Sequence, residues 1–435
     1  MTRKDTGRRR VSRPVGVTIT ALALTALTAA GCSSASSSAG GASTGAVTGA
    51  ATGAATGAAS AAASGGTSAS GTPFAVGAMG TFSGVASGST ADAKTVFQDW
   101  VSATNAAGGI NGHPVQATIL DDQNSPSTAL TNAEQLVQQD HVTVIFDLSD
   151  NLESTFAKVV DAAKVPVLGE SESPVLGTDP NFYSTGTTVE PLIWGEVKAA
   201  SIGKVSKLSN LYCAEIASCA SGSALLAGLG KTVGVSVAYA AKVSSTASSY
   251  TAPCLGSKNS GSQGVTVVAA SDVALSVAES CATQGYKPVY VTTAGEMTTP
   301  WLAQSALNGA IGNTQDVPWI DDSTPATKAM QAAIGKYSPG AAASASFGAT
   351  AVIGWAAGTV FATVAKTAGL TPGSSQTAVI AALDTVKDDT FGGLTPPLTY
   401  TAGKPAQVPC SFIVGIGNGK WTEPNGLKTV CMPGM

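Results

Sequence analysis

The sequence predicts an α/β fold built as two lobes, each a parallel sheet flanked by helices, and two observations lead to this prediction. Strand-like and helix-like segments alternate from Phe74 onward, and the alternation starts again at Leu208. Such alternation is typical of parallel sheets covered by helices. The segment from Pro73 to Met435 is also too long for one small core, so two units of similar size account for it.

The first unit contains four short apolar runs with the length of strands, separated by helical patterns. The predicted strands span 75–79, 115–120, 142–146 and 165–168. A helix with Val96, Phe97 and Trp100 on one face is ended by Gly108 and Gly109. The next helix begins at Ser125-Pro126, because serine is a good N-cap and proline suits the first turn. A third helix is expected over 152–163.

The second unit repeats this pattern and ends differently. Strands are expected at 208–212, 234–238, 265–269 and 289–292, with helices at roughly 221–232, 245–258 and 271–284. Three helices at 326–337, 347–368 and 375–386 follow without strands, and we expect them to pack on one lobe's sheet. The apolar stretch 349–365 is interrupted by glycines and threonines, so we expect a buried helix. Asn418-Gly419 predicts a type I′ hairpin between 411–416 and 420–422.

Composition and motifs exclude several function classes. Charged residues make up 11% of the chain, the net charge is −4, and no basic stripe follows the N-terminal segment, which argues against nucleic-acid binding. No Gly-x-Ser-x-Gly motif is present, and the two histidines, His113 and His141, offer no obvious general base. We therefore expect a protein that is not an enzyme and has no cofactor. A secreted hydrolase on another α/β fold is the disfavoured alternative.

Six cysteines follow Cys32, and in an exported protein an even number favours disulfides. Sequence neighbourhood favours pairing Cys213 with Cys219, Cys254 with Cys281, and Cys410 with Cys431, although other connectivities remain open. A zinc site would need closely spaced cysteines or nearby histidines, so no metal is expected.

The N-terminal segment has the organisation of a lipoprotein signal peptide. Three arginines at 8–10 precede an apolar run from Val15 to Ala30, and small residues lead to Cys32. This order predicts cleavage before Cys32 and lipidation of its sulfur, although Ala29 stands where leucine or valine is usual. The Ser/Ala/Gly/Thr-rich segment 33–72 is predicted to be a disordered linker with a reach of roughly 35 Å. The folded part is therefore expected on the extracytoplasmic face of the cell membrane.

Several motifs together resemble the branched-chain amino-acid-binding proteins of ABC importers. They are VGAMGTFSG at 76–84, AGGINGHP at 107–114, DDQNSP at 121–126, GYKPVYVTT at 285–293 and VPWIDD at 317–322. The resemblance implies a type I periplasmic-binding fold with three crossovers between the lobes. Lobe 1 would comprise 73–192 plus 323–390, and lobe 2 193–322 plus 391–435. It also implies a monomer that traps a small polar solute, such as an amino acid or amide, and delivers it to an ABC permease.

The same resemblance places the solute at loops that follow the strands. The residues expected to bind it are Ser83, Ser149, Asp150, Ser171, Ser173, Thr293 and Asp322. Hydroxyl groups there can donate hydrogen bonds to a carboxylate. Asp150, Glu170 and Glu172 add acidic groups that would repel an anion, so we also expect a solute with an ammonium or amide donor. An extracellular sensor domain on the same fold, reporting to a signalling partner, is the alternative function.

Replacing the predicted lipidation site tests the anchor. Because the acyl chains need the sulfur of Cys32, Cys32→Ala should abolish lipid modification and release the protein from the membrane fraction. Metabolic labelling with a fatty acid measures this. Equal labelling of the variant and the parent would contradict the lipoprotein assignment.

Overall fold

The computed structural model describes residues 69–84, 87–148, 151–215 and 217–435. Its first sheet has five strands in the order β2-β1-β3-β4-β5, and all neighbours run parallel. The strands are β1 (Phe74–Gly80), β2 (Val115–Asp121), β3 (Ile145–Leu148), β4 (Val167–Glu170) and β5 (Phe182–Ser184). The predicted signal peptide and almost all of the predicted linker lie outside the described residues. Of that linker, Ser70 donates a backbone hydrogen bond to the carbonyl of Gly112.

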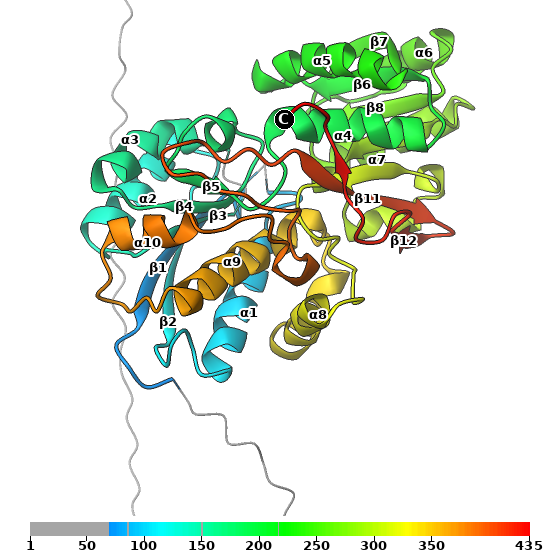
Figure 1. Cartoon of the computed structure of the whole chain (residues 1–435). Helices are drawn as coiled ribbons and strands as arrows, with labels where there is room; N and C mark the ends of the chain where they lie inside the picture. Colours follow the sequence, from blue (N-terminus) through cyan, green and yellow to red (C-terminus); the bar gives the residue numbers. More distant parts are fainter. Residues whose placement is uncertain (1–68, 85–86, 149–150, 216) are drawn as a thin grey trace, which may run out of the picture. The chain divides into compact units, whose positions relative to one another are not determined.

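Helices cover both faces of this sheet because its residues alternate between two apolar clusters. Val76, Phe146 and Leu168 belong to the cluster that includes α1 and α9, which lie side by side in Figure 1. Met79 and Ile145 belong to the cluster formed with α2 and α3. The helices of this lobe are α1 (Ala93–Ala106), α2 (Pro126–Gln138), α3 (Glu153–Ala163), α8 (Pro325–Tyr337), α9 (Ile353–Thr367) and α10 (Gln376–Leu383).

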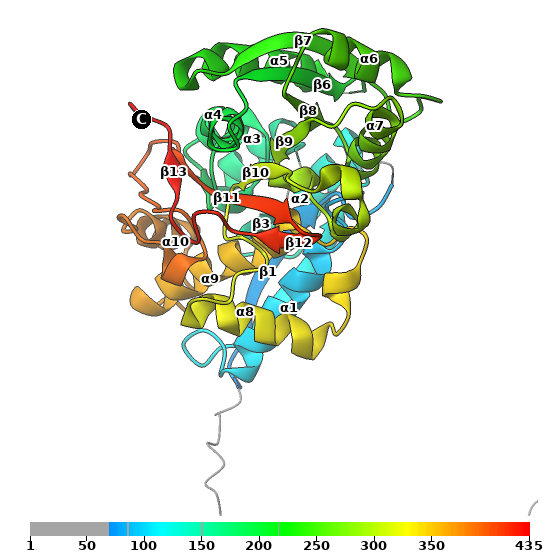
Figure 2. The ribbon, with the colours of Figure 1, turned by 90° about the vertical axis from the view of Figure 1, so that its right-hand side faces the viewer.

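The second sheet has the order β12-β11-β10-β9-β8-β6-β7, and β13 pairs with β11. Strands β6 to β10 are parallel, whereas β11 runs antiparallel to β10 and to its other neighbours. In Figure 2, β13 lies at one end of β11 and β12 at the other. The strands are β6 (Lys207–Cys213), β7 (Ser236–Val243), β8 (Gly264–Val268), β9 (Val289–Thr293), β10 (Ile311–Thr314), β11 (Cys410–Gly417), β12 (Lys420–Thr422) and β13 (Val430–Cys431).

Four α-helices and several short 3-10 helices complete the fold. The α-helices are α4 (Val189–Ile202), α5 (Ala217–Gly230), α6 (Thr251–Asn259) and α7 (Ser271–Thr283). The 3-10 helices are η1 (Pro174–Gly177), η2 (Lys231–Val233), η3 (Ala294–Glu296), η4 (Thr299–Ala303), η5 (Ser305–Leu307), η6 (Ala341–Ala343), η7 (Ala349–Val352) and η8 (Phe391–Gly393). Helices α4 and α5 share an apolar cluster with one face of the second sheet, and α7 packs on the other face.

Most predicted elements are confirmed, including two with specific local signals. Ser125 caps α2, since its hydroxyl accepts a hydrogen bond from the backbone N–H of Thr128 at 3.4 Å. Asn418 and Gly419 have φ values of 54° and 67°, as the type I′ hairpin requires. The predicted helix at 245–258 begins too early, because α6 starts only at Thr251. The predicted strand at 234–238 is too short, because β7 continues to Val243.

Three segments join the two lobes, and hydrogen bonds tie them together. They are the residues between β5 and α4, between β10 and α8, and between α10 and β11. The backbone N–H of Thr187 donates to the carbonyl of Gln315 at 3.1 Å, and its hydroxyl donates to the carbonyl of Cys410. The backbone N–H of Thr188 donates to Val408 at 3.2 Å. All three crossovers therefore form one hydrogen-bonded hinge.

The apolar segment predicted as a buried helix lies inside the first lobe. Within the described residues, Ala349–Thr367 is the one helical stretch long and apolar enough to cross a membrane. Most of its residues are buried against the rest of the protein, and Phe361 and Val360 are fully covered. It is a core helix of the lobe.

Three disulfides join the cysteines that neighbour one another in the sequence. They are Cys213–Cys219, Cys254–Cys281 and Cys410–Cys431, with sequence separations of 6, 27 and 21 residues. The last one links β11 to β13, and Cys410 lies beside the hinge residue Thr187. It thereby fastens the C-terminal segment to the third crossover.

Removing this third disulfide should destabilise the folded part. Cys410→Ala with Cys431→Ala opens a loop of about 20 residues, and the chain-entropy model gives a loss of about 3 kcal/mol. The matched pair Cys213→Ala with Cys219→Ala opens a much shorter loop and should cost about 1 kcal/mol less. Guanidinium unfolding of the folded part measures both. An unchanged free energy of unfolding for the first pair would contradict this assignment.

Candidate functional site

A small cavity lies where residues of the two lobes meet. The first lobe contributes Glu170 at the end of β4 and Thr350 in η7, and the second contributes Thr293 at the end of β9 and Asn313 in β10. Its volume is about 10 Å³, enough for one water-sized group. In parallel sheets, ligands bind beyond the carboxyl ends of the strands. The cavity occupies this position in both sheets.

Two buried carboxyl groups face each other beside this cavity. Glu170 is 2% exposed, and Asp316, two residues beyond β10, is fully buried. No hydrogen bond of normal geometry from the described residues reaches Oε2 of Glu170 or either carboxyl oxygen of Asp316. Burial, reinforced by the neighbouring carboxyl, raises the pKa of Glu170 well above its usual value, and burial does the same for Asp316. One proton shared between the two groups removes the repulsion of two buried charges.

Gly186 makes room for this pair. A Cβ atom at this position would lie 1.6 Å from Oε2 of Glu170, closer than any side chain tolerates. The neighbouring Gln315 holds the same region together, because its Nε2 donates to the carbonyls of Thr187 at 2.8 Å and Ser171 at 3.3 Å. The loop after β4 is thereby attached to the hinge.

A second group of acids joins the lobes through Thr293. Its hydroxyl lies 2.6 Å from Oε2 of Glu296 and 3.4 Å from Oε1 of Glu172, which follows β4 in the other lobe. Thr292 also donates to Glu296, at 2.7 Å. Burial and the nearby Glu172 raise the pKa of Glu296 well above its usual value. Glu172 retains exposed surface, but the lobes enclose it enough for desolvation to raise its pKa as well.

Glu196 is a third acid near this group, and it lies in the middle of α4. Its side chain is 1% exposed, and Oε1 accepts a hydrogen bond from the hydroxyl of Thr266. Burial raises the pKa of Glu196 to about 8, with a smaller contribution from Glu172. The group therefore combines carboxyls from the loop after β4, from α4 and from η3.

The predicted binding residues lie in different environments. Ser171 is buried and donates to Oε1 of Glu153, while the hydroxyl of Ser173 accepts from the backbone N–H of Val175 and caps η1. Thr293 lies between the lobes, as described above. Ser171 and Thr293 are thus brought close to the same interface, with Glu172 between their loops.

Ser83 and Asp322 are exposed, and their contacts are with residues outside the acidic group around Thr293. The hydroxyl of Ser83 donates to Oδ2 of Asp121 at 2.5 Å. Burial, with the carboxylates of Asp321 and Asp322, raises the pKa of Glu423 to about 7, which places Asp322 near the end of β12. No contact among the described residues joins Ser83 or Asp322 to the acids around Thr293. Ser149 and Asp150 lie outside the described residues.

Sequence reasoning missed four residues of this site. Asp316 and Asn313 belong to β10 and its end, a strand that the sequence pattern did not reveal. Glu196 lies in α4, a helix buried on nearly all sides, so no polar face marked it. Glu296 stands three residues after Thr293, and this acid next to a predicted strand end was the one available signal.

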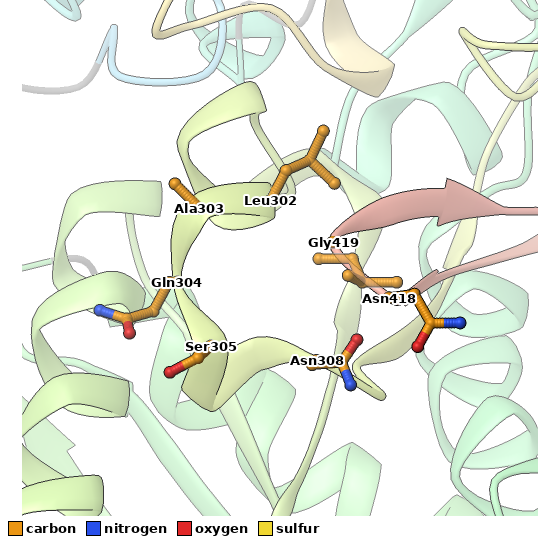
Figure 3. Close-up of a pocket in the computed structure, with 8 residues that line it drawn as sticks. Leu302, Ala303, Gln304, Ser305, Asn308, Asn418 and Gly419 are labelled. Atoms are coloured by element: carbon orange, nitrogen blue, oxygen red, sulfur yellow. The ribbon is translucent and has the colours of Figure 1, made fainter.

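A larger cavity of about 310 Å³ lies away from the lobe interface. It is lined by Leu302, Ala303, Gln304, Ser305 and Asn308 and by the hairpin residues Ile416, Asn418 and Gly419 (Figure 3). All of its lining residues are uncharged. Among the described residues, no group of three or more His, Cys, Asp or Glu side chains is arranged to hold a metal ion.

The raised pKa of Glu196 makes stability depend on pH. The unfolded chain loses this proton near pH 4.5, whereas the folded protein keeps it up to about pH 8. Ionisation of the unfolded state therefore lowers stability as pH rises through this window. Glu196→Gln cannot ionise, so its stability advantage should grow from near zero at pH 4.5 to a few kcal/mol at pH 8. Denaturant unfolding across this range measures it, with the exposed Glu279→Gln as control; parallel curves for Glu196→Gln and the parent would refute the assignment.

Comparisons with known proteins agree with this architecture. The chain is similar to a leucine-binding protein from Thermotoga maritima, with 13% identity, a TM-score of 0.66, and coverage of 82% of this chain and 99% of that one. It is also similar to an ABC-transporter solute-binding protein from R. palustris in complex with 4-hydroxybenzoate, with 18% identity, a TM-score of 0.66, and coverage of 82% and 97%. A second R. palustris solute-binding protein, in complex with benzoate, gives 14% identity, a TM-score of 0.66, and coverage of 83% and 98%.

These structural likenesses, at such low identity, show a shared fold. No curated protein sequence matches the chain significantly. The family model described as periplasmic binding protein matches residues 73–420, which is nearly the whole folded part. With two α/β lobes, three crossovers and a polar site between them, this chain belongs to the periplasmic binding protein family.

Proposed function

We propose that this protein is the extracytoplasmic solute-binding lipoprotein of an ABC importer. In this role it is held at the membrane by acyl chains on Cys32, and the segment 33–72 is the tether. The folded part captures a small polar solute between its lobes and delivers it to a permease. It performs no chemistry on the solute.

The observation that carries this proposal is the polar contact between the lobes at the ends of β4 and β9. Thr293 and Glu172 approach each other across the interface, and the cavity beside them has walls from both lobes. A solute at this position contacts both lobes at once. Its binding energy then favours the arrangement in which the lobes are together, which is how a ligand shifts a conformational equilibrium.

The hinge supports the same role. Its three crossovers are joined by hydrogen bonds at Thr187 and Gln315, so the lobes can rotate about one place without separating. The similar solute-binding proteins of ABC transporters share this fold. A permease could then distinguish the loaded from the empty protein by the position of its lobes.

A thermal-shift screen of the folded part tests solute binding. Amines, amides, amino acids, aromatic acids and dicarboxylates should include at least one compound that raises the unfolding midpoint, because a ligand specific for the folded state stabilises it by mass action. Failure of every class to shift the midpoint would contradict the proposed function.

A hydroxyl variant then locates the site. Thr293→Val should weaken binding of the identified solute about tenfold or more, since hydrogen bonds to charged groups contribute about 1.5–3 kcal/mol. The matched control is Thr283→Val, an exposed residue of α7 that bonds only within its own helix. Calorimetry compares the two; equal affinities would place the solute elsewhere.

A further inference from the structure

Two buried oxygen atoms at the interlobe cavity accept no hydrogen bond of normal geometry from the described residues. They are Oδ1 of Asn313 and Oε2 of Glu170, whose carboxyl otherwise shares a proton with Asp316, and both residues line the cavity. Glu170 is 2% exposed and Asn313 is fully buried. The other end of the Asn313 amide is fixed, because its Nδ2 donates to the carbonyl of Leu192 at 3.0 Å. Two fixed acceptors that converge on one small space fit a group that donates hydrogen bonds.

The ionisable groups around the cavity are all carboxyls. Glu170 and Asp316 adjoin it, and Glu172, Glu196 and Glu296 form the neighbouring group around Thr293. Within the described part of the chain, no lysine, arginine or histidine lines the cavity. All five arginines of the whole sequence lie within residues 1–13, so the folded part offers no guanidinium to hold a carboxylate in two parallel hydrogen bonds. This environment disfavours an anionic solute and favours a cation.

The size of the cavity narrows the choice of cation. Its volume of about 10 Å³ holds a group the size of a water molecule, and an ammonium group has nearly that size. A guanidinium, an aromatic ring or the carbon frame of an organic amine exceeds this volume, so the lobes would have to separate to admit any of them. Among the residues that the structure describes, the carboxyls are not clustered in the way that holds a metal ion.

We infer that the interlobe cavity binds the ammonium group of a small organic amine, or ammonium itself, with Glu170 and Asn313 as its acceptors, and that the cation takes the place of a proton held by the Glu170 and Asp316 carboxyls. This inference rests on the proposed function and names the substrate class for that same site. The exchange balances: one cation enters, one carboxyl proton leaves to the buffer, and no covalent bond to the solute changes.

The protonation of the cluster gives this exchange a pH dependence. Burial raises the pKa values of Glu170, Asp316 and Glu296, so these groups retain protons at pH values where exposed carboxyls are ionised. Glu172 from the loop after β4 and Glu196 from α4 face Glu296, whereas Glu170 and Asp316 face each other. A cation must compete with the bound proton, so its affinity should rise with pH by up to about tenfold per pH unit.

Calorimetry with a matched set of four-carbon probes tests the inference on the folded protein. The probes are 1,4-diaminobutane, 4-aminobutanoate, succinamide and succinate, with n-butylamine and ammonium chloride to separate a free ammonium ion from an ammonium on a carbon frame. We expect amines to bind at least tenfold more tightly than succinamide and succinate. Measurements in phosphate and MES at pH 6 should show release of about one proton per amine bound, because the measured heat then differs between the buffers by their ionisation enthalpies.

Two variants complete the test. Glu170→Gln should weaken amine binding at least tenfold and abolish proton release, while the exposed Glu134→Gln of α2 should bind as the parent does. A thermal melt confirms that each variant is folded. Preference for succinate, or amine binding without proton release, would overturn the inference and leave the solute-binding role intact. If no amine binds but another solute class raises the unfolding midpoint in the thermal screen, the inference is likewise overturned and the solute-binding role is kept.

Discussion

The hydrogen bonds between the three crossovers are the constraint on which the rest of the structure depends. Thr187 contacts both Gln315 and the carbonyl of Cys410, so one residue joins all three connections between the lobes. Gln315 extends this network to the loop after β4 through Ser171. Because these segments are held at one place, the carboxyl ends of β4, β9 and β10 are directed toward a common cavity. The site exists only because the hinge brings these ends together.

The acids at this interface are unfavourable for stability in isolation. A buried carboxyl without a cation keeps its proton, and as pH rises above its intrinsic pKa the unfolded state gains relative to the folded one. Glu170, Asp316 and Glu196 all belong to this class. The stability of the folded state alone would favour neutral side chains at these positions. Perturbed carboxyls that converge on a cavity are more characteristic of binding sites than of hydrophobic cores.

The similar solved structures show how one fold serves different solutes. Their descriptions name a leucine-binding protein and complexes with 4-hydroxybenzoate and benzoate, while their sequences share less than a fifth of their residues with this chain. The sheets, crossovers and hinge form the common scaffold. We propose that specificity resides at the strand ends and in the loops after them, where this chain carries Glu170, Glu172 and Glu296. Family membership therefore supports the proposed capture of a solute between the lobes, and the loop chemistry supports the proposed class of solute.

The sequence by itself determined the features that depend on local patterns. The alternation of strands and helices, the N-cap at Ser125, the hairpin at Asn418-Gly419 and the cysteine pairs all rest on residues close together in the chain. Helix α4 and strand β10 escaped this reasoning because α4 is buried on nearly all sides and β10 is short and polar, so neither shows a clear period. The resemblance pointed to the carboxyl ends of β4 and β9, and Ser171 and Thr293 there stay predicted binding residues.

Only the tertiary structure decided which polar groups meet. Glu170 and Asp316 are far apart in the chain, and their proximity depends on how the second crossover returns past the first. Gly186 makes this proximity possible because it has no Cβ atom, and a Cβ atom there would collide with the Glu170 carboxyl. Burial sets the protonation of these acids. It is a property of the packed lobes and cannot be read from the periodicity or spacing of residues in the sequence. The physical reason is that electrostatics and hydrogen bonding act through space, whereas sequence patterns report mainly on neighbours along the chain.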